Sequence, residues 1–351
     1  MKRVLLIFLC ALFLSALDSC GGKKTVADDE DIIVIDVPLE ETMDSEIAKR
    51  SVLFDIEEIQ LETAGLESLV GEIRDIKYCD DTLIILSDQT FMLFDMQGRF
   101  IRKINRKGRG RGEYISLSSF EIDEVNHHIV CTGNFDYQIY RYTFDGTFVS
   151  KTEAGFSFLN FALLPDGDFV FFTPFSHNDP NGLWLTDADF NIKSRLVPLV
   201  DYNVNSYAGG SPLVHVNDSV VGYMGVDNDN RFYHVVGDTA IPVYRLVSEA
   251  FEMKEGVYEN LPPFYKMFYC ESDELLIFTL NMMDNSLRYV RTFYDKRTGK
   301  TSYLFRRSYT FDDDDDRKIP DFYCYKGCFF RSVTKGQDSN PAILIYRSKP
   351  M

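Results

Sequence analysis

FMLFDMQGRFIRKINRKGRGRGEY, residues 91 to 114, is the stretch that decides the fold. It begins with an apolar strand pattern, turns at the polar residues Asp95 to Gly98, continues as a second strand and ends in a loop rich in glycine and arginine. Two strand-like runs joined by a short turn that contains glycine predict a β-hairpin. Most of the remaining chain consists of divergent copies of this hairpin, so its repetition predicts the architecture.

A first hairpin of the same kind aligns six times along the chain, and a second hairpin follows all but the last of these copies. Each first hairpin is a short strand, a turn rich in Asp, Asn or Gly, and a more hydrophobic strand. The six copies begin at Ile73, Ser118, Phe158, Ser211, Pro263 and Pro320. Four strands in each repeat predict the blades of a β-propeller.

The sixth repeat is incomplete, because the run that begins at Ala342 supplies a third strand and the chain then ends. The segment Val52 to Glu62, VLFDIEEIQLE, alternates like a strand and has no hairpin partner of its own. We therefore predict an all-β fold, a six-bladed β-propeller whose last blade is closed by this N-terminal strand, so that no open edge remains. The run from Ile32 to Val37 could add an outer strand.

The N-terminus has the layout of a secretory signal. Lys2 and Arg3 precede an apolar run from Val4 to Leu17, which is too short to span a membrane as a helix. The following Asp18-Ser19-Cys20 resembles the lipobox of bacterial lipoproteins, which implies that Cys20 becomes the lipidated N-terminus. The alternative is an ordinary signal peptide with an incidental Cys20. The expected organisation is a signal peptide at 1–19, a lipidated cysteine and acidic tether at 20–50, and the propeller at 51–351.

The charge balance excludes nucleic acid as a partner. The net charge is -17, and removal of residues 1–19 takes away Lys2, Arg3 and Asp18 and leaves -18. So acidic a body does not bind nucleic acid or anionic lipid as a whole. The expected contact with a membrane is therefore the lipid anchor alone.

Five cysteines follow Cys20, and they lie inside apolar, strand-like runs: Cys79, Cys131, Cys270, Cys324 and Cys328. An odd number argues against a complete disulfide framework, even in an oxidising compartment. A bridge between the last two is conceivable, and as a zinc pair they lack two further ligands. Buried free thiols are the favoured state.

Three segments together resemble the six-bladed β-propeller lipoproteins of Bacteroidetes. They are the loop Gly108 to Tyr114, GRGRGEY, the hairpin Phe94 to Phe100, FDMQGRF, and the Leu61-Glu62-Thr63 end of the closing strand. The family usually shows G-x-G-P-G-E-Y in the loop, and Arg111 stands in place of the proline. The resemblance implies a propeller in the cell envelope. It does not imply an activity, because related NHL and lactonase-like propellers include both scaffolds and enzymes.

The glycine-rich loop is also the first candidate binding site. Arg106, Lys107, Arg109 and Arg111 lie among glycines, and guanidinium groups with exposed backbone N–H groups suit a carboxylate, a phosphate or an acidic sugar. The alternative is that the glycines form the turn between blades while the arginines pair with neighbouring carboxylates. If the loop binds a ligand, we expect Arg109 and Arg111 to act together with Tyr137, His177 and Arg231.

Catalytic and metal motifs are absent from the sequence. There is no Gly-x-Ser-x-Gly, His-Glu-x-x-His or dinucleotide fingerprint, and no catalytic residue is assigned. His215 or His177 could reach a metal in the central channel, but isolated histidines are the favoured interpretation. The acidic runs Asp312 to Asp316 and Asp227 to Asn230 lack the spacing of a helical calcium loop. No cofactor is expected, and calcium or another divalent metal is the alternative.

The connections on one face of the predicted propeller are longer and chemically richer than the short hairpin turns on the other. Loops usually carry function. The leading hypothesis is a lipid-anchored envelope module that uses this long-loop face to bind or scaffold a glycan, a peptide or an envelope protein. The alternative is a metal-dependent lactonase- or lyase-like enzyme. Because Gly21 to Lys24 follows Cys20 where surface-exported lipoproteins carry acidic residues, the periplasmic side of the outer membrane is favoured.

Overall fold

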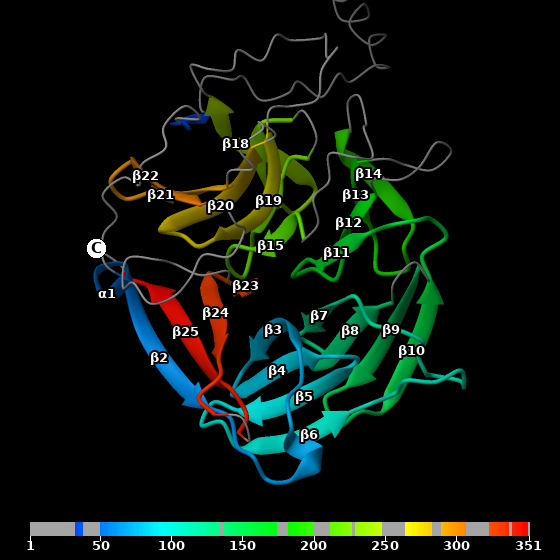
Figure 1. The fold of residues 1–351 in the computed structure, drawn as a ribbon. Helices are drawn as coiled ribbons and strands as arrows, with labels where there is room; N and C mark the ends of the chain where they lie inside the picture. Colours follow the sequence, from blue (N-terminus) through cyan, green and yellow to red (C-terminus); the bar gives the residue numbers. More distant parts are fainter. Residues whose placement is uncertain are drawn as a thin grey trace, which may run out of the picture. The chain divides into compact units, whose positions relative to one another are not determined.

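The computed structural model describes residues 32–37, 50–133, 137–173, 182–198, 211–226, 229–247, 264–282, 289–306, 323–336 and 339–349; the side chains of residues 50, 51, 264, 265 and 282 are not described. Within the compact unit Ile32–Met351 these residues form six β-sheets, each of which is one blade of a β-propeller (Figure 1). The predicted all-β, six-bladed fold is therefore confirmed. In the part of the chain that the structure describes, no helix is long and apolar enough to cross a membrane.

Each blade contains four antiparallel strands that follow one another from the channel outward, and blade 4 has one further strand. Blades 1 to 3 are formed by β3 (Ile73–Cys79), β4 (Thr82–Ser87), β5 (Thr90–Asp95) and β6 (Phe100–Ile104); β7 (Ser119–Asp123), β8 (His128–Thr132), β9 (Gln138–Thr143) and β10 (Phe148–Glu153); and β11 (Asn160–Leu163), β12 (Phe169–Thr173), β13 (Gly182–Thr186) and β14 (Ile192–Pro198). Blades 4 to 6 are formed by β15 (Leu213–His215), β16 (Val221–Met224), β17 (Arg231–Val236) and β18 (Thr239–Val247); β19 (Phe264–Glu271), β20 (Leu275–Met282), β21 (Tyr289–Asp295) and β22 (Lys300–Arg306); and β23 (Tyr323–Tyr325), β24 (Cys328–Val333), β25 (Ala342–Ser348) and β2 (Phe54–Gln60). All six predicted first hairpins are present.

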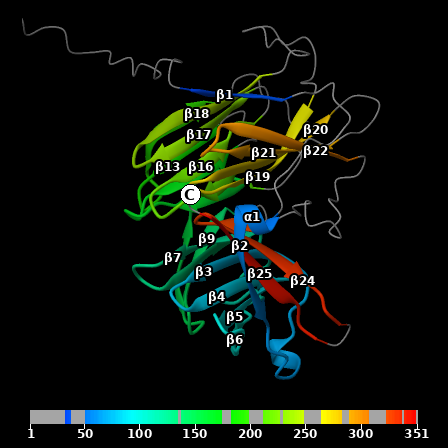
Figure 2. The ribbon, with the colours of Figure 1, turned by 90° about the vertical axis from the view of Figure 1, so that its left-hand side faces the viewer.

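The N-terminal segments complete two blades. Strand β2 pairs antiparallel with β25, from Phe54 opposite Ser348 to Gln60 opposite Ala342, so the predicted closure of the last blade is confirmed. Strand β1 (Ile33–Asp36) pairs parallel with β18 and adds a fifth, outermost strand to blade 4, as Figure 2 shows. The short helix α1 (Arg50–Leu53) leads directly into β2, and a 3-10 turn, η2 (Leu66–Ser68), follows it.

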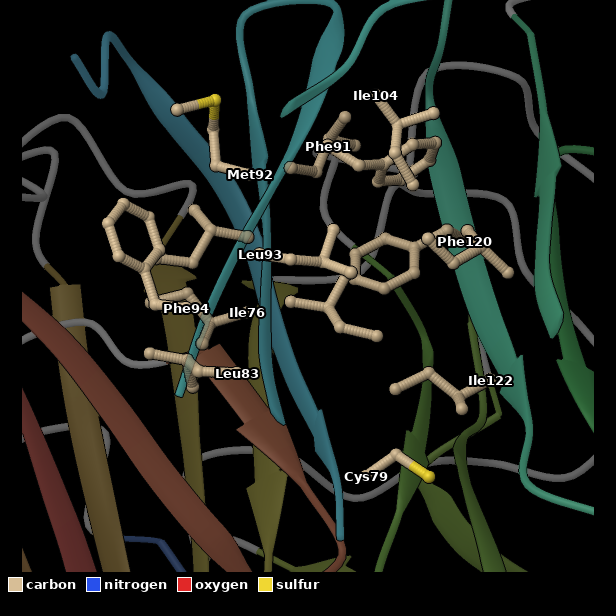
Figure 3. Packing of buried hydrophobic residues seen from close by; sticks show 14 of the residues in the cluster. Ile76, Cys79, Leu83, Phe91, Met92, Leu93, Phe94, Ile104, Phe120 and Ile122 are labelled. Atoms are coloured by element: carbon tan, nitrogen blue, oxygen red, sulfur yellow. The ribbon is translucent and has the colours of Figure 1, made fainter. Parts of the chain in front are cut away.

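The innermost strands contact one another in cyclic order, β3 to β7, β11, β15, β19, β23 and back to β3, so the ring is closed. Apolar layers fill the space between neighbouring blades. Strands β4 and β5 are buried along almost their whole length, because a neighbouring blade covers each face of blade 1. Figure 3 shows this packing between blades 1 and 2, where the rings of Phe91 and Phe120 meet edge to face with centroids 5.2 Å apart.

The turn within the diagnostic hairpin follows from its residues. The Asp95 carboxylate accepts hydrogen bonds from the backbone N–H groups of Gln97 and Arg99, at 3.0 and 2.9 Å, and Gly98 supplies a left-handed φ of 80°. Glycine is also required here sterically, since a Cβ at this position would lie 2.1 Å from the carbonyl oxygen of Gln60. The turn of blade 1 thus packs directly against the closing strand of blade 6.

A buried asparagine also holds the junction between blades 6 and 1. Asn340, 1% exposed, accepts a hydrogen bond from the Val70 N–H at 2.9 Å and donates to the carbonyl oxygens of Glu62 and Ser68 at 2.6 and 2.7 Å. These bonds satisfy a loop backbone that would otherwise be buried without partners. The junction where the ring closes is therefore held by specific polar contacts as well as by strand pairing.

Candidate functional site

Four side chains from the innermost strands meet across the channel. Lys77 Nζ of blade 1 donates a hydrogen bond to Glu121 Oε1 of blade 2 at 2.9 Å, and His215 Nε2 of blade 4 lies 2.8 Å from Glu121 Oε2. The ring of Tyr325, from blade 6, completes the group, with its centroid 4.9 Å from Lys77 Nζ and 5.2 Å from the centroid of the His215 ring. We call these four residues the channel cluster. They link blades that are not neighbours in the ring.

In the channel cluster, burial and the charges of neighbouring groups shift the pKa values in opposite directions. Burial alone would raise the pKa of Glu121, but the positive charge of Lys77 and the contact with His215 outweigh it and hold the pKa below its ordinary value. Burial alone would lower the pKa of Lys77, but Glu121 and Asp75 raise it. Lys77 and Glu121 therefore form a charged, buried pair at neutral pH. Asp75 lies 3.7 Å from Lys77, and its burial raises the pKa of its own carboxyl to about 6.

Directly beside the channel cluster the surface is hollowed, with a volume of about 440 Å³. The walls are the turns between the first and second strands of blades 2, 3, 4 and 6, so we call this side of the propeller the first-turn face. The hollow is lined by Ile122, Asp123, Glu124, Val125, Asn126, Leu163, Leu164, Pro165, Asp166, Gly167, His215, Asp218, Tyr325 and Lys326.

The hollow is predominantly acidic. Among the described residues, four carboxylates line it, and Lys326 is its one lysine or arginine. Lys326 Nζ contacts Glu124 of blade 2 at 2.6 Å and Asp218 of blade 4 at 2.8 Å. Burial alone would lower the pKa of Lys326, but these two carboxylates raise it, so the lysine stays charged. Asp123 and Asp166 carry the remaining negative charge.

A second buried cluster lies between blades 4 and 5. The carboxylate of Glu271, with no exposed surface, lies 2.8 Å from His234 Nε2 and accepts hydrogen bonds from Lys296 Nζ at 2.6 Å and from the Tyr244 hydroxyl at 3.2 Å, as well as from Tyr269. Every oxygen of this carboxylate thus has a protein partner. The arrangement braces two blades and does not line the hollow.

One group of side chains has the composition of a metal site. Cys79 and Asp80, at the first turn of blade 1, meet His127, at the first turn of blade 2, and one donor atom from each lies within 4.8 Å of the other two. No sequence motif indicates this group, because its members come from two different repeats. Cys131, Cys270, Cys324 and Cys328 lie outside it, and all five described cysteines are free thiols, as expected.

The glycine-rich loop packs over the outer part of blade 2. Gly112 lies against the ring of Phe148, and its carbonyl oxygen accepts a hydrogen bond from the Tyr142 hydroxyl at 3.0 Å. The Gly110 N–H donates to the Glu113 carboxylate at 2.7 Å, so this backbone donor already has an acceptor within the loop. Arg106 also braces the junction, because its guanidinium donates to the Gly146 carbonyl oxygen at 2.7 and 3.1 Å.

The structure places the other predicted ligand residues on separate elements. The side chains of Arg109 and Arg111 are exposed, in the connection between blades 1 and 2. Tyr137 packs on Phe158, with ring centroids 6.0 Å apart, and Arg231, at the start of β17 in blade 4, pairs with Asp229 at 2.9 Å. Blade 4 lies across the ring from blade 1, so Arg231 does not join the two loop arginines. His177 and the run Asp312 to Asp316 lie outside the described residues, as do most of the long connections.

Sequence reasoning named His215 as a residue that could reach the channel, but it did not identify Lys77 or Glu121. The available signal was weak. A lysine or a glutamate at an inward-facing position of a predicted innermost strand is unusual, because such positions are mostly apolar or paired. Which inward-facing charges meet depends on the curvature of the ring, which the pattern does not contain.

Comparisons with known proteins support the fold. Residues 32–343 match the model of a family described as a domain of unknown function, DUF4934. A solved structure of a Bacteroides fragilis protein assigned as exported is similar, with a TM-score of 0.69 and 17% identity over 91% of this chain and 100% of that chain. A member of the DUF4221 family from Bacteroides vulgatus gives a TM-score of 0.51 and 9% identity over 86% and 98%. No curated protein matches the sequence. At these identities the likeness shows the fold alone.

Proposed function

The chain belongs to the DUF4934 family, and from its own geometry we propose that it is a binding module whose hollow on the first-turn face takes a ligand with a positively charged amine. The family description assigns no activity, so the proposal rests on the hollow itself. Its volume of about 440 Å³ is within the range of small-ligand sites.

The observation that carries the proposal is the charge of the rim. Glu124 and Asp218 already share Lys326. Asp123 and Asp166 also line the hollow, and the cations that act on them, Arg141 and Lys193, do not belong to its described lining. A protonated amine inside the hollow would therefore meet negative charge at two walls, while an anion would be repelled. The net charge of -17 acts in the same direction at longer range.

The remaining lining suits the carbon chain of such a ligand. Ile122, Leu163, Leu164 and Pro165 form an apolar part of the lining, to which His215 also belongs. An alkylamine, or the lysine side chain of a peptide, combines an apolar stem with a charged end in the way these walls require. A peptide ligand would fit the binding or scaffold role expected from the sequence, although the hollow is lined by short first turns and is not on the long-loop face where binding was expected.

The proposal places this module in the cell envelope. A lipid on Cys20 would anchor it, and the sequence after that cysteine favours the periplasmic side of the outer membrane. The assignment of the similar Bacteroides fragilis protein as exported is in keeping with this location. In such a setting the lipid holds the protein, and the first-turn face is free to meet basic ligands.

The test uses cadaverine and glutarate as probes of equal carbon length and opposite charge, titrated into the purified full chain by calorimetry at low salt. We expect cadaverine to bind and glutarate not to bind. The double variant Asp123→Asn/Asp166→Asn should weaken cadaverine binding at least about tenfold, because charge-assisted hydrogen bonds contribute about 1.5–3 kcal/mol each. Asparagine keeps an oxygen that can accept the turn hydrogen bonds that both aspartates make.

Glu67→Gln, at the exposed turn η2, is the matched control and should leave the affinity unchanged. If both probes bind equally well, or if the double variant binds cadaverine as tightly as the wild type does, the hollow is not an amine-binding site.

A further inference from the structure

We propose that Cys79, Asp80 and His127 form a binding site for a zinc-class divalent metal ion that links the first turns of blades 1 and 2. The proposal is independent of the amine site in the hollow. It rests on the donor atoms, their separations and the way the two turns present them.

The donor set is the first argument. A cysteine sulfur, an imidazole nitrogen and a carboxylate oxygen are the three protein donors that zinc prefers. One atom of each kind lies within 4.8 Å of the other two. Hard cations such as calcium take oxygen ligands instead, so the sulfur and the nitrogen select a softer ion.

The distances between the donor atoms are close to those expected around one zinc ion. With metal–ligand distances of about 2.0–2.3 Å and tetrahedral angles, donors around one zinc ion lie about 3.3–3.7 Å apart. Asp80 Oδ2 is 3.9 Å from Cys79 Sγ and 3.8 Å from His127 Nδ1. Small side-chain adjustments would therefore bring these donors to coordination distance.

The environment is the third argument. Cys79 is 3% exposed and lies at one end of the packed layer between blades 1 and 2, so its position is fixed by the core (Figure 3). The His127 ring packs edge to face on Phe144, with centroids 5.7 Å apart, and this contact orients the imidazole. The side chains of Asp80 and His127 are 75% and 58% exposed, so an ion can enter from solvent and water can occupy its fourth position.

The surrounding charge favours a cation. Glu124 belongs to the same turn as His127, and its acidic neighbours line the adjoining hollow. Lys326, whose positive charge also acts on Cys79, is already held by Glu124 and Asp218. An ion here would cross-link two blades and would contribute to stability through its binding free energy.

The test titrates Zn²⁺ into the reduced full chain by calorimetry, with Co²⁺ as a spectroscopic probe. We expect one ion per chain, a higher melting temperature with Zn²⁺, and a thiolate-to-cobalt charge-transfer band that disappears in Cys79→Ser. His127→Asn should lower the Zn²⁺ affinity at least about tenfold, since even the loss of an outer-shell partner of a metal ligand costs 10–100-fold. Asparagine is chosen because residue 127 has a left-handed φ of 52°.

His128→Asn alters the adjacent histidine, which lies outside the cluster, and should leave the affinity unchanged. This pair of variants decides the question even if Cys79→Ser disturbs the core, because His127 is on the surface. Absence of Zn²⁺ binding, a cobalt–thiolate band that persists without Cys79, or equal effects of the two histidine variants would overturn the proposal and leave adventitious binding only.

Discussion

His215 Nε2 and the Glu121 carboxylate lie 2.8 Å apart, although 94 positions separate the two residues in the chain and they belong to blades 4 and 2. These blades are not neighbours in the ring, so the contact spans the channel. Together with Lys77 it ties three innermost strands to one carboxylate. The axis of this propeller is therefore held by a buried polar group as well as by the apolar layers between blades.

Removal of that carboxylate should be costly. In Glu121→Gln, the Lys77 ammonium would remain buried without its main charged partner, so we expect a loss of about 3–5 kcal/mol in the free energy of unfolding. Glu57→Gln breaks an exposed pair with Arg347 and should cost less than about 1 kcal/mol. Urea unfolding of both variants at pH 7 measures the difference. Similar, small effects would show that the channel cluster contributes little to stability.

Glu271 predicts a specific dependence on pH. Burial would raise its pKa, but the hydrogen bond and charge of His234 and the charge of Lys296 lower it to about 2, from an ordinary value of 4.5. A carboxyl whose pKa is lower in the folded state stabilises that state fully above the unfolded value and loses this contribution as the pH falls. The stability gap between wild type and Glu271→Gln should therefore be constant from pH 7 to about 5 and shrink below about 4.5. A gap that widens on acidification would contradict this assignment.

The closing strand offers a matched pair of isoleucines. Ile59 is 3% exposed and packs in the core, whereas Ile56 on the same strand is 45% exposed. Ile59→Ala should cost about 2–5 kcal/mol in unfolding free energy, while Ile56→Ala should change it by about 0.5 kcal/mol or less.

Deletion of residues 20–63 removes the whole closing strand and should leave an exposed strand edge on β25 and a protein that aggregates. An unchanged melting temperature after that deletion would mean that the ring does not depend on β2.

Lipid anchoring is tested at Cys20. Cys20→Ala should abolish incorporation of radiolabelled fatty acid and release the protein from the membrane fraction, because the thioether-linked lipid would be its membrane attachment. Cys79→Ala serves as a control, since that thiol is buried in the folded protein. Labelling that persists in Cys20→Ala would place the lipid elsewhere.

The loop arginines remain a candidate anion site. Because the Gly110 N–H already donates to Glu113, an outside anion would depend on the exposed side chains of Arg109 and Arg111. If they bind an acidic glycan, Arg109→Ala/Arg111→Ala should weaken binding at least about a hundredfold and leave the melting temperature unchanged. Arg106→Ala is the contrasting variant, since Arg106 braces the blade junction and should affect stability. A double variant that melts earlier and keeps its affinity would assign the two arginines a structural role.

The repeat pattern made the fold predictable. Alternation along a strand and the chemistry of a short turn are local properties, so each hairpin could be recognised from its own residues. The last repeat supplies one strand fewer than a blade needs, so the segment Val52 to Glu62 was predicted to close that blade. The pairing of β2 with β25 confirms this prediction. The pattern also indicated that the run from Ile32 to Val37 could form an outer strand, but it did not predict that this strand would pair with β18.

The sequence by itself thus determined the blades and their closure, and it favoured the free state of the thiols that the structure describes. Only the tertiary structure decided which side chains meet between blades. Lys77, Glu121 and His215 lie on three different innermost strands, and their contact depends on how the ring curves and how far each strand extends toward the axis. The same holds for Cys79 and His127, which belong to different repeats and come together only because two turns of neighbouring blades lie side by side. Contacts within a repeat follow from local pattern, whereas contacts between repeats follow from the closed ring.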